Sequence, residues 1–274
     1  MSAEIVIRTD GLARRFGTIQ AVAGVDLEVR RGEVFGFLGP NGAGKSTTIR
    51  MLCTLLRPSA GHASVAGFDV AANPAQVRAH IGLVFQDTSL DEQLSARENL
   101  AFHAAIYGMP TRASRLRIEE MLRCVGIEDR ADSLVRTFSG GMKRRLEIAR
   151  GVLHMPQVLF LDEPTIGLDP QTRRHIWSQL DAMRHNEGVT LFMTTHYMDE
   201  AEHCDRIAII DHGRIQAVGT PDELKRLTGG GDASTRPSLD DVFMHLTGRA
   251  IREDRADTRD AMRAAMRRRT GHAR

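Results

Sequence analysis

The chain has few of the residues that mark secreted, membrane-spanning or nucleic-acid-binding proteins. Its three cysteines, Cys53, Cys124 and Cys204, are widely spaced and form no CxxC pair, so we expect buried, reduced thiols rather than disulfides or a metal site. No stretch approaches the roughly 20 apolar residues that a membrane-spanning helix needs. The N-terminus, MSAEIVIRTD, does not have the pattern of a signal peptide. We therefore expect any role at a membrane to depend on a partner protein.

Charge of one sign is also scarce. The 274 residues carry a formal net charge of only +2, whereas dedicated nucleic-acid binders usually have a strong basic excess, so we expect no nucleic-acid partner. The apolar fraction of 42% and the charged fraction of 26% are ordinary for a globular protein. Lysine is rare: most basic residues are arginines, and the lysines are Lys45, Lys143 and Lys225. A lysine at position 45 is notable for that reason.

The hydrophobic pattern predicts an α/β fold. Residues 5–29 alternate as antiparallel strands do, and short apolar runs at 33–38, 81–85, 158–161 and 189–194 are typical of buried strands. Strands at 206–210 and 214–218 flank Asp211-His212-Gly213, which favours a hairpin. Helical patterns occupy residues 45–56, 75–80, 95–125, 139–153 and 172–185, and another helix begins near 198. Alternation of this kind predicts a mainly parallel sheet covered by helices.

The stretch 95–125 has helical character with a break at residues 108–110, Gly-Met-Pro. Its apolar side chains recur at roughly helical spacing, and we interpret them as core positions of a helical subdomain. These residues are Leu100, Ile106, Leu116, Met121 and Leu122.

The C-terminal part has a different composition. Residues 228–238 have the composition of a linker, and a short helix is expected within SLDDVFMHLTGR, at the start of an extension covering 239–274. Residues 249–274 hold nine arginines and four acidic residues. A solvated tail is the simpler interpretation, and a basic helix on anionic lipid or a partner is the alternative.

A glycine-rich segment predicts a site for nucleoside triphosphates. Residues 39–46, GPNGAGKS, fit the pattern G-x-x-x-x-G-K-[ST] between an expected strand and an expected helix. Glycines allow successive backbone N–H groups to turn toward phosphates, and the helix N-terminus adds unpaired donors. Lys45 supplies a cation for the β- and γ-phosphates and Ser46 a hydroxyl ligand for Mg²⁺. The expected ATP-binding residues are Gly39, Pro40, Asn41, Gly42, Ala43, Gly44, Lys45, Ser46 and Thr47.

A second segment narrows the chemistry, because kinases, GTPases and motors share the first. Residues 158–163, VLFLDE, resemble the Walker B strand of phosphate-loop ATPases. Asp162 at the strand end would hold Mg²⁺, directly or through water, and Glu163 would orient and polarise the attacking water. Two acids that simply cap a strand are the alternative, and the phosphate loop upstream disfavours it.

The segment 138–170, FSGGMKRRLEIARGVLHMPQVLFLDEPTIGLDP, resembles the ABC transporter ATPases. Ser139-Gly140-Gly141 at the start of a helix, upstream of an Asp-Glu strand end, is similar to the signature motif of that family. The family usually has Gln where this chain has Met142. The serine hydroxyl, the glycine amides and the helix N-terminus can still bind phosphate, and any contact made by the Gln amide is lost.

Further positions match in order and spacing across roughly residues 5–227. Gln86 resembles the Q-loop residue that senses Mg²⁺ and contacts the membrane subunit, and Asp169 resembles the D-loop residue of the dimer interface. His196 resembles the switch histidine that contacts the γ-phosphate. Phe16 resembles the A-loop aromatic, usually Tyr, that stacks on adenine. Alone, Gln86 or His196 would be an ordinary polar residue and Phe16 a core residue, but their order favours the family interpretation.

The resemblance implies a fold, a cofactor and partners. It implies a phosphate-loop ATPase core with an N-terminal antiparallel region and a helical signature subdomain at about 88–155, together spanning 1–227. It implies Mg²⁺, and two copies that sandwich ATP so that Ser139, Gly140, Gly141 and Met142 act on the neighbour's nucleotide. It also implies a separate transmembrane permease as partner, with this chain bound peripherally at the cytoplasmic face of a bacterial membrane.

Several functional alternatives stay open at this point. Soluble translation-type members of the family usually carry two cassettes and repair-type members a long coiled coil, whereas this chain has one cassette and no heptads. A non-hydrolytic ATP-binding regulator is disfavoured by Glu163. The ending PSLDDVFMHLTGR resembles that of daunorubicin-resistance-type drug exporters, which favours export of a drug-like or antibiotic substrate. Export of lipid or polysaccharide is the runner-up, and the sequence does not identify the substrate.

Overall fold

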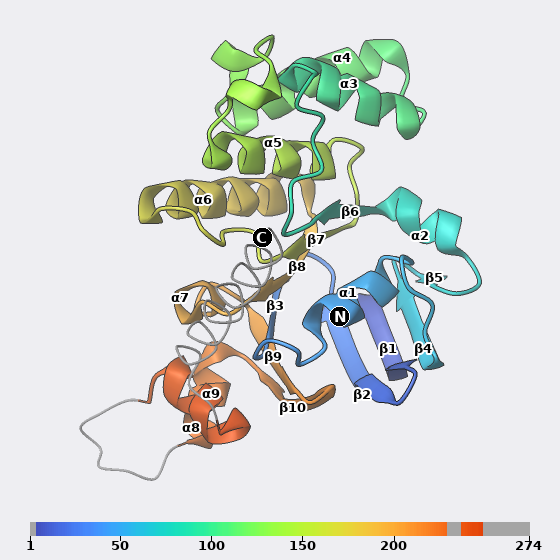
Figure 1. The fold of residues 1–274 in the computed structure, drawn as a ribbon, viewed down its shortest axis with the longest axis vertical. Helices are drawn as coiled ribbons and strands as arrows, with labels where there is room; N and C mark the ends of the chain where they lie inside the picture. Colours follow the sequence, from blue (N-terminus) through green and yellow to red (C-terminus); the bar gives the residue numbers. More distant parts are fainter. Residues whose placement is uncertain (1–3, 229–236, 249–274) are drawn as a thin grey trace, which may run out of the picture.

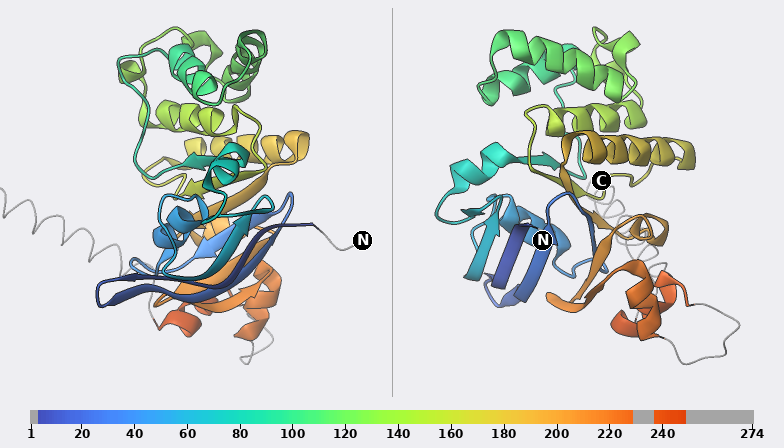
Figure 2. Two further views of the ribbon diagram at one scale, coloured as in Figure 1. Left: turned by 90° about the vertical axis from the view of Figure 1, so that its right-hand side faces the viewer. Right: turned by 180° about the vertical axis from the view of Figure 1, so that it is seen from behind.

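The computed structural model of the chain describes residues 4–228 and 237–248. Its parts are layered (Figures 1 and 2): α3 (Ala96–Ile106) and α4 (Thr111–Cys124) lie at one end, above α5 (Gly140–Val152) and α6 (Pro170–Glu187). A six-stranded sheet lies beneath these helices, and a four-stranded sheet and the last helices occupy the other end. This is the α/β architecture that the sequence predicts.

The six-stranded sheet has the order β10-β9-β3-β8-β7-β6. All neighbours pair in parallel except β9 and β10, which form the predicted hairpin. The strands are β3 (Val34–Leu38), β6 (Ile81–Val84), β7 (Val158–Asp162), β8 (Thr190–Thr195), β9 (Arg206–Asp211) and β10 (Arg214–Gly219). Every residue of β3, β7 and β8 is buried, as expected for parallel strands that are covered on both faces.

Alternate residues of the central strands enter two separate cores. In β7, Val158 and Phe160 pack with the four-stranded sheet and α1, whereas Leu159 and Leu161 pack with α5 and α6. The Phe192 ring lies 5.4 Å from the Phe160 ring, centroid to centroid, within the range of favourable aromatic pairs. Both faces of the sheet are therefore anchored, and the carboxyl ends of its strands are held in place.

The four-stranded sheet is antiparallel, with the order β2-β1-β4-β5. It confirms the antiparallel region predicted at residues 5–29, here β1 (Ile5–Phe16) and β2 (Ile19–Arg30). The sheet also contains β4 (Ala60–Val65) and β5 (Phe68–Asp69), where the sequence has no clear strand pattern. Two further helices are α1 (Lys45–Leu52), which follows β3, and α2 (Pro74–His80), which follows β5. The helix predicted at 45–56 ends early because Thr54 takes a left-handed conformation, with φ of 63°.

The helical region 95–125 divides as predicted into α3 and α4 around residues 108–110. Ser95 begins α3 with a reciprocal capping box with Glu98. Leu100, Met121 and Leu122 are buried as expected, but the prediction that Ile106 and Leu116 are core residues is wrong. Their side chains are 63% and 68% exposed, because their faces of the two helices are turned away from the core. Two short 3₁₀ helices, η1 (Glu128–Arg130) and η2 (Val135–Thr137), lead to α5.

The remaining helices are α7 (Met198–Ala201), α8 (Pro221–Leu227) and α9 (Leu239–Thr247). The helix predicted within SLDDVFMHLTGR is confirmed as α9, which Ser238 caps. Most of the predicted linker at 228–238 and all of the basic tail at 249–274 lie outside the described residues. Within 4–228 and 237–248, no helix combines the length and the apolar character needed to cross a bilayer.

Candidate functional site

The glycine-rich loop connects the end of β3 to the start of α1. Gly44 has a φ of 107°, and a Cβ atom there would lie 2.5 Å from the Ala21 carbonyl oxygen. A Cβ atom on Gly39 would lie 2.3 Å from the Ile210 carbonyl oxygen. Only glycine fits at either position, so the path of the loop depends on both residues.

The Lys45 side chain is turned back over this loop. Its Nζ atom donates to the carbonyl oxygens of Gly39, at 2.6 Å, and Pro40, at 3.1 Å. The side chain is 6% exposed. A buried ammonium group held by carbonyl oxygens fixes a positive charge inside the loop.

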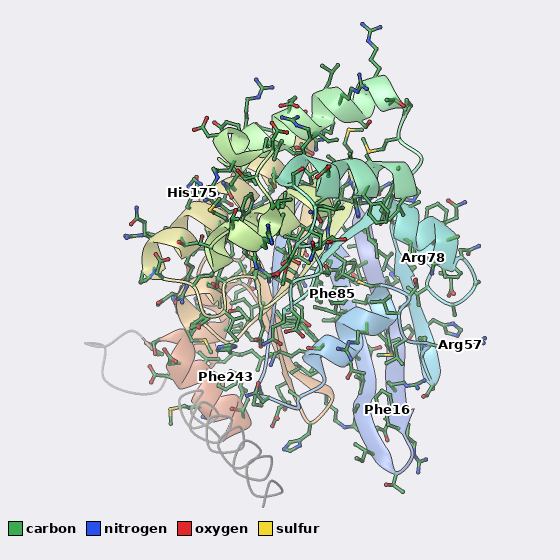
Figure 3. All side chains as sticks on the ribbon, turned by 45° about the horizontal axis from the view of Figure 1, so that its top comes forward. Phe16, Arg57, Arg78, Phe85, His175 and Phe243 are labelled. Carbon is green, nitrogen blue, oxygen red and sulfur yellow. The ribbon has the colours of Figure 1, made fainter. Side chains whose placement is uncertain are left out.

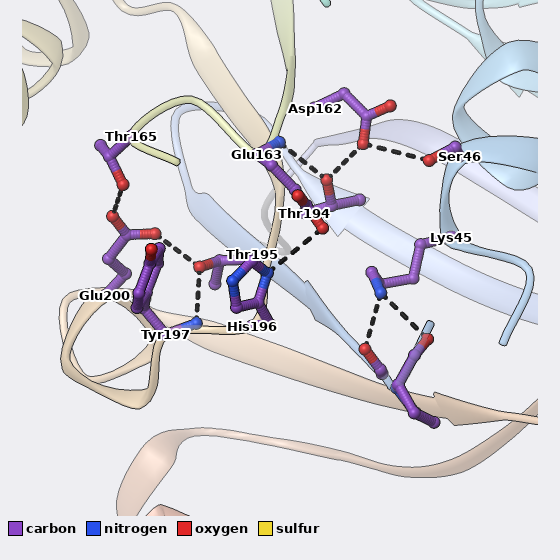
Figure 4. Close-up of polar contacts among 12 residues, drawn as sticks. Lys45, Ser46, Asp162, Glu163, Thr165, Thr194, Thr195, His196, Tyr197 and Glu200 are labelled. Carbon is purple, nitrogen blue, oxygen red and sulfur yellow. Dashed lines mark hydrogen bonds and ion pairs between the residues drawn. The ribbon is translucent and has the colours of Figure 1, made fainter. Parts of the chain in front are cut away.

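Three oxygen-bearing side chains meet beside the loop. The Ser46 hydroxyl lies 3.3 Å from Oδ1 of Asp162, and the Thr194 hydroxyl donates to the same oxygen at 2.6 Å (Figure 4). Ser46 is in the first turn of α1, and Asp162 and Thr194 are at the ends of neighbouring parallel strands. These hard oxygen donors fit the ligand preference of Mg²⁺.

Glu163 follows Asp162 with a left-handed backbone, φ of 49°. Its N–H donates to the backbone oxygen and to the hydroxyl of Thr194, and these contacts stabilise the uncommon conformation. Its Oε1 atom lies 3.3 Å from Nδ1 of His196 (Figure 4). Burial raises the pKa of Glu163, but the hydrogen bond and charge of His196 and the charge of Lys45 outweigh it and leave this pKa below its usual value.

The predicted signature residues form the start of α5. The Ser139 hydroxyl accepts from the N–H of Met142 at 3.3 Å and so caps the helix. A Cβ atom on Gly141 would lie 2.8 Å from Cγ2 of Thr172 in α6, whereas one on Gly140 would meet no atom within 4 Å. Gly141 therefore permits the close approach of the two helix starts.

Asp169 caps α6 at this contact. Its Oδ1 atom accepts from the N–H groups of Gln171 and Thr172, and Oδ2 accepts from the Thr172 hydroxyl at 2.6 Å. These hydrogen bonds lower the pKa of the Asp169 carboxyl. The side chain thereby joins the loop at 167–169 to the helix that touches the signature segment.

Phe16 and Gln86 occupy more open positions. Phe16 ends β1 with 44% of its side chain exposed, and the Arg14 guanidinium lies 4.7 Å from its ring centroid. Gln86 is exposed, two residues after the end of β6. Figure 3 shows Phe16 and Arg57 on the side of the four-stranded sheet, and Phe85, the neighbour of Gln86, beneath the helices. The structure thus brings Lys45, Ser46, Asp162, Glu163 and His196 together, with Phe16 and Gln86 at separate edges.

Sequence reasoning missed two buried carboxylates near this site. Glu200 accepts from the hydroxyls of Thr165 and Thr195, which flank Glu163 and His196 along the chain. Glu147 in α5 lies beside Arg144, with 3.2 Å between Oε2 and Nη1. Charged residues within predicted helices are usually on the surface, so only the three-residue spacing of Arg144 and Glu147 hinted at a pair.

Comparisons with known proteins agree with this geometry. A family model described as ABC transporter matches residues 22–166. The daunorubicin/doxorubicin resistance ATP-binding protein DrrA of Streptomyces peucetius is 44% identical over 256 residues, covering 90% of this chain and 77% of that protein. The probable multidrug ABC transporter ATP-binding protein YbhF of Escherichia coli is 42% identical over 243 residues, covering 89% of this chain but only 42% of that protein.

A solved structure extends the comparison to the fold. The ATP-binding cassette MJ0796, in a dimeric post-hydrolysis state bound to ADP and Pi, superimposes with a TM-score of 0.71 and 26% identity. The match covers 78% of this chain and 98% of that chain. With the family model matching more than half of the residues and DrrA matching over most of both chains, the chain belongs to the ABC transporter family.

Proposed function

We propose that the chain binds Mg-ATP and hydrolyses it at sites shared by two copies, and that this powers export of a drug-like or antibiotic substrate through a separate membrane subunit. One observation carries the proposal: Lys45, Ser46, Asp162, Glu163 and His196 converge at the carboxyl ends of parallel strands. Ligands of open α/β sheets bind at that edge.

The phosphates of ATP would occupy the loop of residues 39–47. The N–H groups of the loop and the start of α1 offer donors to the phosphate oxygens. Lys45 would exchange its contacts with Gly39 and Pro40 for the β- and γ-phosphates. Phe16 would stack on adenine, because its ring is the exposed aromatic surface at the end of β1.

Ser46 and Asp162 are the residues that would hold Mg²⁺, with Gln86 approaching from the segment after β6. The cation, when bound, neutralises charge on the phosphate oxygens. Thr194 keeps Asp162 oriented through its hydrogen bond to Oδ1.

Glu163 and His196 would act on the water and the γ-phosphate. A lowered pKa keeps the Glu163 carboxyl ionised at neutral pH, so it can accept a hydrogen bond from the attacking water and take up its proton. The water oxygen forms a bond to the γ-phosphorus as the bond to the β–γ bridging oxygen breaks. His196 holds Glu163 through the Nδ1 contact, and its ring can turn its other nitrogen to the γ-phosphate.

The signature residues Ser139, Gly140, Gly141 and Met142 would bind the nucleotide of the second copy. The N-terminus of α5 presents N–H donors and a favourable dipole for phosphate. The dimeric state of the MJ0796 cassette supports this arrangement. Asp169 would shape the loop that crosses between the copies, since its capping bonds fix the start of α6.

The transport assignment rests on the relatives. DrrA is described as a daunorubicin/doxorubicin resistance protein and YbhF as a probable multidrug transporter component. We place the chain at the cytoplasmic face of a bacterial membrane, bound to a permease. Phe102 and Ile106 of α3 are exposed and one helical turn apart, which supports the α3–α4 region as the surface that meets the permease.

Glu163→Gln tests the proposal by size-exclusion chromatography with light scattering, with and without Mg-ATP. We expect bound ATP, loss of turnover and a shift from monomer to dimer with two nucleotides per dimer. Lys45→Ala is the control, for which we expect weak binding and no dimer. Normal turnover in Glu163→Gln, or ATP binding unchanged in Lys45→Ala, would contradict the proposal.

A further inference from the structure

Arg144 of α5 is a buried arginine, 7% exposed, on the same helix as the signature residues. Its guanidinium has five N–H donors, and each has an acceptor. Nε donates to the Pro164 oxygen, Nη1 to the Phe85 oxygen and to the Glu147 carboxylate, and Nη2 to the Asp162 and Glu163 oxygens. All of these acceptors except Glu147 are backbone carbonyls of other segments.

Those carbonyls belong to the two segments that matter most for hydrolysis. Residues 162–164 carry Asp162 and Glu163 at the end of β7, and Phe85 immediately precedes Gln86. The Arg144 guanidinium thus connects the backbone of Glu163, the proposed catalytic carboxylate, to Phe85. Phe85 begins residues 85–89, which we call the Gln86 loop. In Figure 1, α5 lies above the edge of the six-stranded sheet that β6 and β7 form.

Glu147, one turn further along α5, joins the other end of the same loop. Its Oε1 atom accepts from the N–H of Ser89 at 2.8 Å, and its side chain is 2% exposed. Arg150 adds two contacts from the same helix, donating to the Ser89 oxygen and hydroxyl. The Gln86 loop is therefore held to α5 at both ends, through Phe85 and Ser89.

These contacts are rigid for a physical reason. A buried charge is tolerated only while its hydrogen bonds are made, and the planar fork of arginine allows little change in the direction of its five donors. A tilt or shift of α5 therefore moves residues 162–164 and the Gln86 loop with it, or leaves charged groups unpaired.

We infer that Arg144 and Glu147 form a positioning pair that couples the signature end of α5 to Glu163 and the Gln86 loop of the same chain, and so makes hydrolysis at the two sites of the dimer cooperative. The inference rests on the proposed function, in which Ser139–Met142 contact the neighbour's nucleotide. Binding at that nucleotide fixes α5, and α5 then fixes the carboxylate of its own site. Such coupling needs two arrangements of one packed element that both sites bias, and α5 with its buried pair provides that element.

Arg144→Lys tests the inference in the full-length protein. Lysine keeps the charge but offers only three donors from one nitrogen, so it cannot satisfy all five acceptors of Arg144. We measure steady-state ATP hydrolysis across ATP concentration, and ATP binding to the monomer under non-turnover conditions. We expect kcat to fall by about tenfold or more, as for a group that positions a catalytic residue, and the Hill coefficient to fall to about 1 from a wild-type value approaching 2. Monomer affinity for ATP should stay unchanged.

Arg117→Lys is the matched control. Arg117 is similarly buried, at 9%, and also donates to two backbone carbonyls, of Val152 and Leu153, and to the carboxylates of Glu187 and Glu120. Arg117 belongs to α4 and contacts the end of α5 that is farthest from the signature residues, so we expect a loss of thermal stability with the Hill coefficient unchanged. Glu147→Gln is the second variant, since it keeps the side-chain shape and removes the charge. It should lower the Hill coefficient in the same direction as Arg144→Lys.

The outcomes separate this inference from the proposed function. Wild-type turnover without cooperativity would overturn the inference, as would Arg144→Lys and Glu147→Gln proteins that behave like Arg117→Lys. A wild-type protein that neither binds nor hydrolyses ATP would overturn the proposed function and the inference with it.

Discussion

Nδ1 of His196 lies 3.3 Å from Oε1 of Glu163, although 33 residues separate them in the chain. The two residues meet because β7 and β8 are parallel neighbours and each residue directly follows the end of its strand. The contact matters for acidity as well as position. Burial alone would raise the pKa of Glu163, and the hydrogen bond and charge of His196 are the leading influences that lower it.

His196→Ala should therefore change both the rate and its pH dependence. Without His196, the effect of burial on the Glu163 pKa is opposed mainly by the charge of Lys45, so this pKa rises. The Glu163 carboxylate then becomes protonated at a higher pH. We expect kcat for ATP hydrolysis to fall by about 10²-fold or more, with ATP binding kept. The acidic limb of the pH–rate profile should move to higher pH. His185→Ala, on the exposed face of α6, is the control, and an acidic limb that stays in place would rule out this effect of His196.

The two signature glycines should respond differently to alanine. The Cβ atom of Gly141→Ala would lie 2.8 Å from Cγ2 of Thr172, and Thr172 cannot rotate freely because its hydroxyl is bonded to Asp169. We expect a loss of about 1–3 kcal/mol in the free energy of unfolding, as for other overpacked sites. Gly140→Ala should be neutral or slightly stabilising, because no atom lies within 4 Å of the added methyl.

Thr172→Ser offers a rescue of that defect. Serine removes only Cγ2 and keeps the hydroxyl for Asp169. The double variant Gly141→Ala with Thr172→Ser should recover most of the lost free energy of unfolding, measured by urea denaturation. Additive losses in the double variant would show that the clash with Thr172 is not the cause.

Ser139 combines a structural and a proposed functional contribution, and two substitutions separate them. Ser139→Ala removes the cap of α5, which should cost about 1 kcal/mol and lower the Tm by about 2–4 °C. Ser139→Asp keeps a capping oxygen but places a negative charge where the neighbour's phosphate is proposed to bind. Combined with Glu163→Gln, it should fold normally and fail to dimerise in Mg-ATP.

Ser95→Ala is the control for this experiment, because Ser95 caps α3 with the same kind of bond, to the N–H of Glu98. In the Glu163→Gln background it should lose stability and still dimerise. If the Ser139→Asp protein in the Glu163→Gln background formed the ATP-bound dimer as readily as the Ser95→Ala protein does, the signature end of α5 would not face the neighbour's phosphate.

Local patterns predicted the elements whose formation depends on local chemistry. The buried apolar runs gave β3, β7 and β8, because parallel strands covered on both faces need uninterrupted apolar residues. The glycine-rich loop was predictable for a similar reason, since glycine is the only residue type that fits the backbone surroundings at positions 39 and 44. The roles of the site residues stay predictions.

Features that depend on distant packing were not predictable in the same way. Helical spacing places Ile106 and Leu116 on faces of α3 and α4, but does not say that these faces remain uncovered. The residues of β4 are mostly polar or small, and they form a strand because β1 offers a pairing edge. Arg144 and Glu147 have the sequence appearance of a surface pair, and only the approach of β6 and β7 to α5 buries them.

Acid should destabilise the protein through two histidines at the junction of α3 and α5. Burial, as the largest cause, lowers the pKa of His103 and of His154 to about 4, and the His154 ring stacks on Tyr107 at 3.8 Å. The unfolded chain binds protons at these residues near the ordinary pKa of 6.5, whereas the folded chain does not until about pH 4. The unfolded state therefore binds more protons between these values, and stability falls as the pH drops through that window.

His154→Phe isolates the contribution of one of these residues. Phenylalanine keeps a ring against Tyr107 and cannot be protonated, although it loses the hydrogen bond from the imidazole to the Ile81 oxygen. Between pH 8 and pH 5 the wild type should lose about 1–2 kcal/mol more unfolding free energy than the variant, after allowance for partial solvent exposure. Urea denaturation at both pH values measures this difference. His62→Asn, at an exposed position on β4, is the control and should keep the wild-type pH dependence of the unfolding free energy. An equal loss of unfolding free energy in the wild type and in His154→Phe would mean that His154 does not resist protonation in the folded chain.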